Sequence, residues 1–212
     1  ALSFYATKTV TTGEGGMVVT DSEEIANRAR SMRLHGLTRD AWKRYSGGGS
    51  WYYEIEDVGF KYNLTDVAAA IGLVQLDRAE AMRIERERVA RRYETAFAAS
   101  DIGDLVELPR MPRSNEVHAW HLFPIRPHLD RVKITRAETI DRLTEAGIGT
   151  SVHFIPLHLH PYYRRTYGYA PADLPVANAQ YEREISLPIY PDLTDGDVDY
   201  VVERLTGILR PR

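Results

Sequence analysis

Residues 3–8 of the chain read Ser-Phe-Tyr-Ala-Thr-Lys, and residues 13–20 read Gly-Glu-Gly-Gly-Met-Val-Val-Thr. A strand-like apolar run therefore leads to Lys8, and a glycine-rich turn and a second strand follow it. A lysine held at the end of a buried strand loses its proton more readily than one in water, because desolvating the ammonium is costly, and it becomes a usable amine nucleophile. The alternative for Lys8 is an ordinary surface residue, since lysines are rarely buried. The alternative for the glycine-rich turn is an ordinary hairpin, because its glycines lack the spacing of phosphate-binding loops.

The composition is that of an ordinary globular protein. The 212 residues are 43% hydrophobic and 27% charged, which is enough to bury a core in one domain or two small ones. The net charge of -3 gives no reason to expect nucleic acid or an anionic membrane as a partner. The sequence has no cysteine, no signal-peptide pattern and no apolar run approaching about 20 residues. We therefore expect a cytoplasmic protein without disulfides or thiolate metal sites.

Two helices are expected in the first half of the chain. The first begins at Asp21-Ser22-Glu23-Glu24, which offers a capping oxygen and acids for the first turn, and a common stop signal at residues 35–36 ends it. Its residues Ile25, Ala29 and Met32 recur at helical spacing and predict one buried face. The second helical pattern is the longest, from residue 65 to about 98, and its charged second half predicts a solvated surface.

The second half of the chain has the pattern of a compact α+β domain. Apolar strands are expected over residues 119–126 and 148–154, after a linker over residues 109–115. Two helices are expected to begin at the capping boxes of Thr135 with Glu138 and of Thr194 with Asp197.

The lysine segment resembles that of the DegT/DnrJ-type sugar aminotransferases. These are pyridoxal-phosphate (PLP) enzymes of the aspartate-aminotransferase fold. The other family motifs follow in the right order, at Arg33–Gly36, Gly59–Asp66, His118–Phe123, Gly147–Thr150 with Val152–Phe154, and Leu187–Pro191. The resemblance covers essentially the whole chain. It implies an α/β fold, the PLP-dependent transferase fold type I, with part of the large cofactor-binding domain and its connecting helix in residues 1–98 and a small α+β domain in residues 99–212.

In this family roughly half of the chain precedes the lysine. The resemblance therefore implies that this sequence is the C-terminal part of a larger enzyme. We expect it to need the N-terminal half, which carries the phosphate-binding turn and the partner of the pyridine nitrogen, and to be inactive without it.

The resemblance also implies a set of cofactor-binding residues. Lys8 is the expected catalytic residue, which carries PLP as a Schiff base. Ser3 is expected to contact the cofactor phosphate, although it could be an ordinary strand serine. The segment with Lys61 and Asn63 is expected to reach the phosphate in the neighbouring subunit of a homodimer, whose active site lies at the interface. Relatives often have asparagine at position 61, so either residue could make the contact.

Four residues are expected to face the sugar substrate by the same resemblance: His35, His153, Phe154 and His160. A packing role is the alternative for these histidines, and His35 could interact only with a helix dipole. The close spacing of His153, His158 and His160 also allows a metal-dependent hydrolase. Against that reading, the sequence has no HExxH motif, and no acidic residue lies between positions 152 and 165.

The expected activity is transamination. Relatives that carry histidine in place of the lysine catalyse dehydration, whereas this sequence has Lys8. We expect an amino acid, glutamate or a similar one, to donate its amino group to a nucleotide-linked keto sugar in polysaccharide or antibiotic sugar biosynthesis. The aromatic, basic segment over residues 37–58 could bind the nucleotide or form a dimer contact. The alternatives are the metal-dependent hydrolase and an inactive dimerisation fragment.

Overall fold

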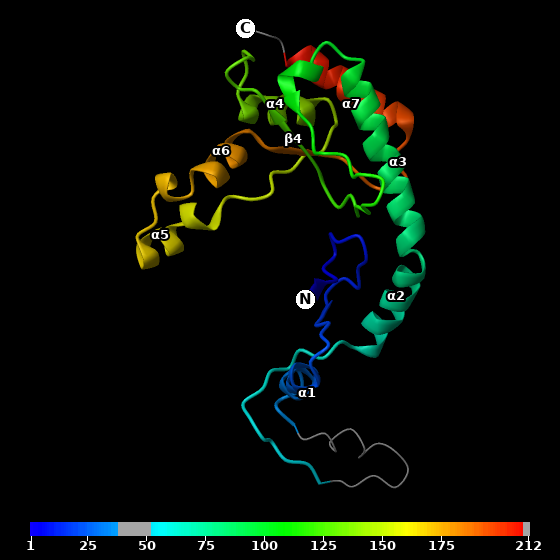
Figure 1. Ribbon diagram of the computed structural model, residues 1–212, viewed down its shortest axis with the longest axis vertical. Coiled ribbons are helices and arrows are strands. Elements are labelled where there is room, and N and C mark those ends of the chain that lie inside the picture. Colours follow the sequence, from blue (N-terminus) through cyan, green and yellow to red (C-terminus); the bar gives the residue numbers. More distant parts are fainter. Residues whose placement is uncertain (38–51, 210–212) are drawn as a thin grey trace. The chain divides into compact units, whose positions relative to one another are not determined.

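The computed structural model describes residues 1–37 and 52–209, which form two compact units (Figure 1). Unit 1 covers Ala1–Ala79 and unit 2 covers Glu80–Arg212. Most of the aromatic segment expected to bind a nucleotide or a second subunit lies outside the described residues. Within the described ranges, no helix combines the length and the apolar character that crossing a membrane requires.

The described residues of unit 1 form one short strand pair and two helices. Strands β1 (Leu2–Ser3) and β2 (Gly16–Met17) pair antiparallel, with Leu2 opposite Met17. Helix α1 spans Glu23–Met32 and helix α2 spans Asp66–Asp77. Each begins at a hydroxyl cap, because Ser22 and Thr65 accept backbone hydrogen bonds from Ile25 and Ala68.

The buried face predicted for α1 is wrong in this chain. Ile25 is 53% exposed, and neither α1 nor α2 buries a side chain among the described residues. The physical reason is that the two-residue strands β1 and β2 give too little sheet to cover an amphipathic helix. Among the described residues of unit 1, the apolar side chains of Ile25, Ile71 and Val74 are consequently exposed.

The long helix expected from residue 65 to about 98 is two helices. After α2 ends at Asp77, Arg78 caps it, and α3 spans Ala79–Ala98. The end at Ala98 is confirmed. The charged half is not simply solvated, because Val89, Ala90 and Tyr93 are fully buried on one face of α3.

Unit 2 is built on a three-stranded antiparallel sheet. Its order is β3 (Val106–Glu107), β4 (Phe123–Pro127) and β5 (Ile185–Leu187). In β4 the side chains of Phe123, Ile125 and Pro127 are buried while those between them are half-buried, as alternation along a strand requires. The strand starts later than expected because Trp120 adopts a left-handed backbone conformation, φ 47°.

Helices α4 (Arg136–Glu145) and α7 (Asp195–Ile208) share one hydrophobic core with α3 and the sheet. Both capping boxes are confirmed, and both helices begin immediately after their cap residues Thr135 and Thr194. The rest of unit 2 consists of short elements: η2 (Gly103–Leu105), η3 (Leu157–Leu159), α5 (Pro161–Tyr167), η4 (Pro171–Asp173) and α6 (Pro175–Arg183).

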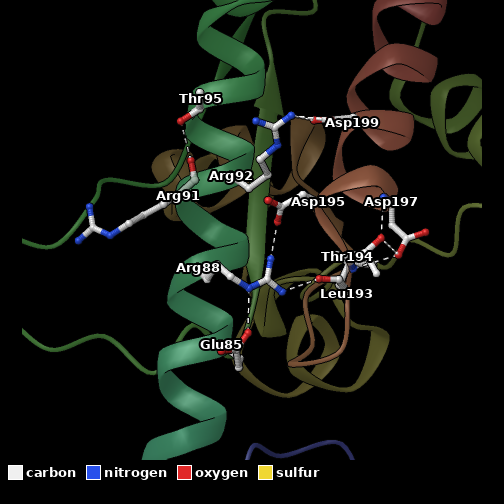
Figure 2. A network of polar contacts seen from close by, with 10 residues as sticks. All are labelled: Glu85, Arg88, Arg91, Arg92, Thr95, Leu193, Thr194, Asp195, Asp197 and Asp199. Atoms are coloured by element: carbon white, nitrogen blue, oxygen red, sulfur yellow. Dashed lines mark hydrogen bonds and ion pairs between the residues drawn. The ribbon is translucent and has the colours of Figure 1, made fainter.

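Ion pairs join α3 to α7 (Figure 2). Arg88 pairs with Asp195, and Arg92 pairs with Asp199. The second terminal nitrogen of Arg88 also donates to the carbonyl oxygen of Leu193 at 2.8 Å, just before the cap of α7. The charged face of α3 therefore has a structural use, which is to hold the C-terminal helix of unit 2.

The strand expected over residues 148–154 is wrong. Only Ser151 pairs with β5, exchanging two backbone hydrogen bonds of 3.2 and 2.8 Å with Ser186. Because β5 is only three residues long and β4 occupies its other edge, little backbone remains for a longer pairing. The single bridge nevertheless fixes the segment that carries His153.

Candidate active site

Lys8 lies in a closed loop between β1 and β2. The base of the loop is Phe4, whose backbone N–H donates to Gly15 at 2.9 Å and whose carbonyl accepts from Thr12 at 3.0 Å. Inside the loop, the backbone N–H of Lys8 donates to the carbonyl of Tyr5 at 2.9 Å. The side chain of Lys8 is half-buried, and its amine makes no hydrogen bond or ion pair with residues 1–37 or 52–209. The loop thus presents an amine that no carboxylate of the described chain neutralises.

The glycine-rich turn packs this loop against the segment before α2. A Cβ atom on Gly15 would lie 2.6 Å from the hydroxyl of Thr12 and 2.9 Å from Leu64, and one on Gly16 would lie 2.8 Å from the carbonyl of Leu2. Thr12 is 7% exposed, and its methyl group would lie 3.0 Å from a Cβ on Gly72 of α2. These distances leave no room for a side chain at the turn, which lies close to Leu64.

Two sequence motifs of unit 1 pair with one another. The backbone N–H of His35 donates to Phe60 at 2.9 Å, and that of Tyr62 donates to Arg33 at 2.8 Å. A Cβ atom on Gly36 would lie 1.9 Å from the carbonyl oxygen of Asp57, so only glycine fits there. The pairing positions Lys61 and leaves the side chain of His35 exposed.

Lys61 and Asn63 form a donor pair. The ammonium of Lys61 donates to the side-chain carbonyl oxygen of Asn63. This contact orients the amide so that its NH₂ group, with two donors, remains available beside the ammonium. The two side chains together suit an anion such as a phosphate, whereas Ser3 lies exposed on β1 with its oxygen accepting from the N–H of Tyr5 at 3.4 Å.

Arg86 connects two further motifs inside unit 2. Its guanidinium donates to the carbonyl of Trp120 at 3.1 Å and to that of Ile189 at 2.8 Å. Burial lowers the pKa of Arg86, since no carboxylate among the described residues pairs with it. Two carbonyl acceptors take the place of a counter-ion and fix the motifs over residues 118–123 and 187–191.

His153 is held by a buried carboxylate and a buried hydroxyl. Its backbone N–H donates to Oε2 of Glu184 at 2.9 Å, and its Nδ1 lies 3.0 Å from Oγ of Ser186. Oγ of Ser186 donates to Oε1 of Glu184 at 2.6 Å. Glu184 and Ser186 are only 5% and 3% exposed, whereas Phe154, whose ring meets that of His153 edge-on, is 74% exposed.

The three histidines do not form a metal site. His158 is 3% exposed, and its Nε2 has no hydrogen-bond partner in the described structure, while His160 directly precedes α5. His153 instead turns Nδ1 toward Ser186. No group of three or more His, Asp or Glu residues in the described ranges could hold a metal ion. The metal-dependent hydrolase considered from the sequence is therefore wrong.

Glu184 and Ser186 were missed in the sequence reading. The only feature of the sequence that pointed to them was their position beside the motif Leu187–Pro191. A sequence pattern does not show that a carboxylate and a hydroxyl at these positions are buried. The remaining predicted residues fall into two groups. Unit 1 holds Lys8, Ser3, His35, Lys61 and Asn63, and unit 2 holds His153, Phe154 and His160.

The described part of the chain thus combines α/β elements, a loop lysine without an ion-pair partner there, and a small antiparallel domain. The chain belongs to the DegT/DnrJ/EryC1/StrS aminotransferase family, whose model matches residues 1–206. Its fold is part of the PLP-dependent transferase fold of that family. The family and fold class expected from the sequence are thereby confirmed.

Two curated relatives align over almost the entire chain. Uncharacterized protein MJ1066 of Methanocaldococcus jannaschii is 54% identical over 209 residues, which are 99% of this chain and 53% of the relative. Spore coat polysaccharide biosynthesis protein SpsC of Bacillus subtilis is 48% identical over 211 residues, again 99% of this chain and 53% of the relative. The chain therefore spans about half the length of the curated relatives it matches.

The solved structures agree with this. Spr1654 from Streptococcus pneumoniae, a candidate sugar aminotransferase in its PMP form, superposes with a TM-score of 0.83 and 34% identity. The match covers 97% of this chain and 51% of Spr1654. The same protein in its PLP form matches with a TM-score of 0.82.

Proposed function

We propose that this chain carries the Schiff-base lysine of a PLP-dependent sugar aminotransferase, and that this lysine is Lys8. The single observation that carries the proposal is the amine of Lys8, which the family's lysine segment presents from a closed loop without a carboxylate partner in the described chain. The PLP and PMP forms of Spr1654 support the cofactor. The part that SpsC takes in polysaccharide biosynthesis supports a sugar as the acceptor.

The residues of unit 1 fit PLP chemically. An amine without an ion-pair partner can condense with an aldehyde, because it has no salt bridge to break first. The ammonium of Lys61 and the amide of Asn63 supply adjacent donors for a phosphate, and we propose that both contribute. Ser3 is a further phosphate contact on this proposal. When bound, PLP supplies the electron sink for removal of a proton next to the amino group.

Lys8 has two tasks in the proposed reaction. Its amine would hold PLP between turnovers, and once freed it would act as the base that takes a proton from the carbon of the amino donor. A lysine is suited to this because its flexible four-carbon stem can move the amine between two positions. The closed loop based on Phe4 keeps the backbone of Lys8 in place while its side chain moves.

The substrates follow from the same proposal. Glutamate or a similar amino acid donates the amino group, and a nucleotide-linked keto sugar accepts it. His153, Phe154 and His160 of unit 2 and His35 of unit 1 are proposed to contact the sugar. We further propose a cytoplasmic homodimer with the active site at its interface, in which residues 1–98 belong to the large domain and residues 99–212 form the small domain.

A half-reaction tests the proposed activity without knowledge of the sugar. The full-length protein that contains this chain is loaded with PLP and mixed with L-glutamate, and conversion of bound PLP to PMP is followed by absorbance. Wild type should convert, and Lys8→Arg, which keeps the charge but places no primary amine in the loop, should slow conversion by at least about 100-fold.

Lys133→Arg is the matched control because it changes another lysine of the chain, exposed in unit 2, by the same substitution. It should convert at the wild-type rate. Conversion by Lys8→Arg at the rate of wild type would contradict the role of Lys8. Absence of cofactor binding and of conversion in wild type would favour the alternative of a dimerisation protein.

A further inference from the structure

A buried carboxylate in unit 2 lies outside every role assigned so far. Glu184 is 5% exposed and has no ion-pair partner among the described residues. Its two oxygens accept hydrogen bonds from the backbone N–H of His153 and from the hydroxyl of Ser186. Burying a carboxylate is costly, and these two donors stabilise it. One donor is the backbone of His153, and the other is the hydroxyl that lies beside the ring of His153.

The hydrogen-bond directions determine where the proton of the imidazole lies. A serine hydroxyl has one proton to donate, and Ser186 donates it to Oε1 of Glu184 at 2.6 Å, a short contact of the charge-assisted kind. Oγ of Ser186 can therefore only accept from Nδ1 of His153, which lies 3.0 Å away. In the neutral ring the proton is then on Nδ1, and Nε2 carries a lone pair.

We propose that Glu184 and Ser186 are positioning residues that fix His153 in its Nδ1-protonated form, so that Nε2 is an acceptor for a hydrogen-bond donor on the ligand. The assignment of the ligand as a sugar, whose hydroxyl would be that donor, rests on the proposed function. The proton position does not rest on it, because it follows from residues of this chain alone.

The arrangement is rigid enough to select one proton position. The backbone bridge between Ser151 and Ser186 joins the two segments beside the ring, and the second bond of Glu184 holds the peptide of His153 itself. Ser186 is 3% exposed, so water cannot replace its hydroxyl readily. A second hydroxyl, that of Ser151, lies 3.3 Å from the same nitrogen but is exposed and has no link to the carboxylate.

Ring ¹⁵N NMR of the full-length protein tests this directly. The protein is labelled with ring-¹⁵N histidine, the signals of His153 are assigned with His153→Gln, and the spectra are recorded where the ring is neutral. The proposal predicts a protonated, pyrrole-type signal for Nδ1 and an unprotonated, pyridine-type signal for Nε2. The opposite assignment in wild type would overturn it.

Two serine substitutions separate positioning from mere packing. Ser186→Ala should change the ratio of the two tautomers toward Nε2 protonation by about fivefold, the equivalent of one typical lost hydrogen bond. Ser151→Ala removes a hydroxyl near the same nitrogen and should leave the ratio as in wild type. An unchanged ratio in Ser186→Ala, or an equal change in both variants, would overturn the proposal.

Two further variants keep the test decisive if Ser186→Ala folds poorly. Ser186→Thr retains a hydroxyl and should retain Nδ1 protonation. Glu184→Gln can turn its NH₂ toward Ser186, which frees the hydroxyl proton for Nδ1, so the ratio should move toward Nε2 protonation. A ratio in Glu184→Gln equal to that of wild type would contradict the inference. None of these spectra requires the cofactor. The tautomer proposal can therefore be contradicted while the PLP half-reaction succeeds, and it can hold while the half-reaction does not occur.

Discussion

A Cβ atom on Gly59 would lie 2.1 Å from the backbone nitrogen of Gly36. The two motif glycines therefore meet backbone to backbone, and no side chain of any size fits between them. Gly36 is also left-handed, with φ 70°. This contact holds the segment with Lys61 and Asn63 beside the segment that follows α1.

We expect Gly59→Ala to destabilise unit 1 by about 1–3 kcal/mol, because the clash is with backbone that cannot rotate away. The measurement is the free energy of unfolding in urea, with amide exchange to locate the loss. Gly207→Ala is the control, since a Cβ on this exposed residue of α7 meets nothing within 4 Å. It should stabilise unit 2 by up to about 1 kcal/mol, as alanine does in a helix. Equal effects of the two substitutions would contradict the contact.

The pair of Arg92 and Asp199 should contribute measurably to unit 2 because it joins α3 to α7 (Figure 2). Arg92→Met is expected to lower the free energy of unfolding, as the loss of an ion pair between two helices does. Arg91→Met removes only a pair with Glu87 on the same helix and should cost about 0.3–0.5 kcal/mol. A double-mutant cycle with Asp199→Asn gives the coupling energy, which should shrink in 1 M salt, where the screening length is about 3 Å. A coupling energy of zero at low salt would refute the prediction.

Stability should fall at acid pH partly through the capping box of α7. Hydrogen bonds from the hydroxyl and the backbone N–H of Thr194 lower the pKa of Asp197 below its ordinary value. A carboxyl whose pKa is lower in the folded chain stabilises the fold above the unfolded pKa of about 3.9, and this contribution is lost as pH falls through the folded pKa.

Unfolding in urea at pH 6 and pH 3 tests this. Wild type should exceed Asp197→Asn in stability at pH 6, and the difference should shrink at pH 3. Glu203→Gln, which removes an exposed acid from the same helix, should show a smaller change between the two pH values. The same difference between wild type and Asp197→Asn at both pH values would exclude the carboxylate as the cause.

The caps were predictable from the sequence because they depend on residues three positions apart. Thr135 with Glu138 and Thr194 with Asp197 behave as their spacing indicates. The buried face of α1 was not predictable in the same way, because the helical spacing of Ile25 says only which residues share a face and not whether this chain covers them. The break at Arg78 likewise has no proline or glycine to mark it.

Asn63→Ala and Lys61→Ala should each weaken binding of PLP by the full-length protein by at least about tenfold, if both residues hold the phosphate as proposed. The loss in Lys61→Ala should diminish at high salt, because it removes a charge. Fluorescence titration with PLP measures the affinities, and Lys133→Ala controls for the loss of any lysine. Wild-type affinity in one of the two variants would assign the phosphate contact to the other residue alone.

A sequence motif can name a candidate site residue, but it does not show where two distant segments meet. Lys8 and His153 stand out by their residue type and by the segments around them. Glu184 lies 31 residues from His153 along the chain, and their hydrogen bond and the bridge between Ser151 and Ser186 exist only in the folded structure. The histidine cluster failed as a metal site for the same reason, since closeness in sequence did not make the rings of His153 and His158 converge.

Covalent trapping of the cofactor tests the central claim most directly. This chain contains four lysines, Lys8, Lys43, Lys61 and Lys133. The full-length protein is incubated with PLP, reduced with borohydride and digested, and the peptide that gains the reduced pyridoxyl phosphate is identified by mass spectrometry. The account predicts one stoichiometric label, on Lys8, that is absent from Lys8→Arg. A stoichiometric label on another lysine, or no label on Lys8 in protein that has bound PLP, would contradict it.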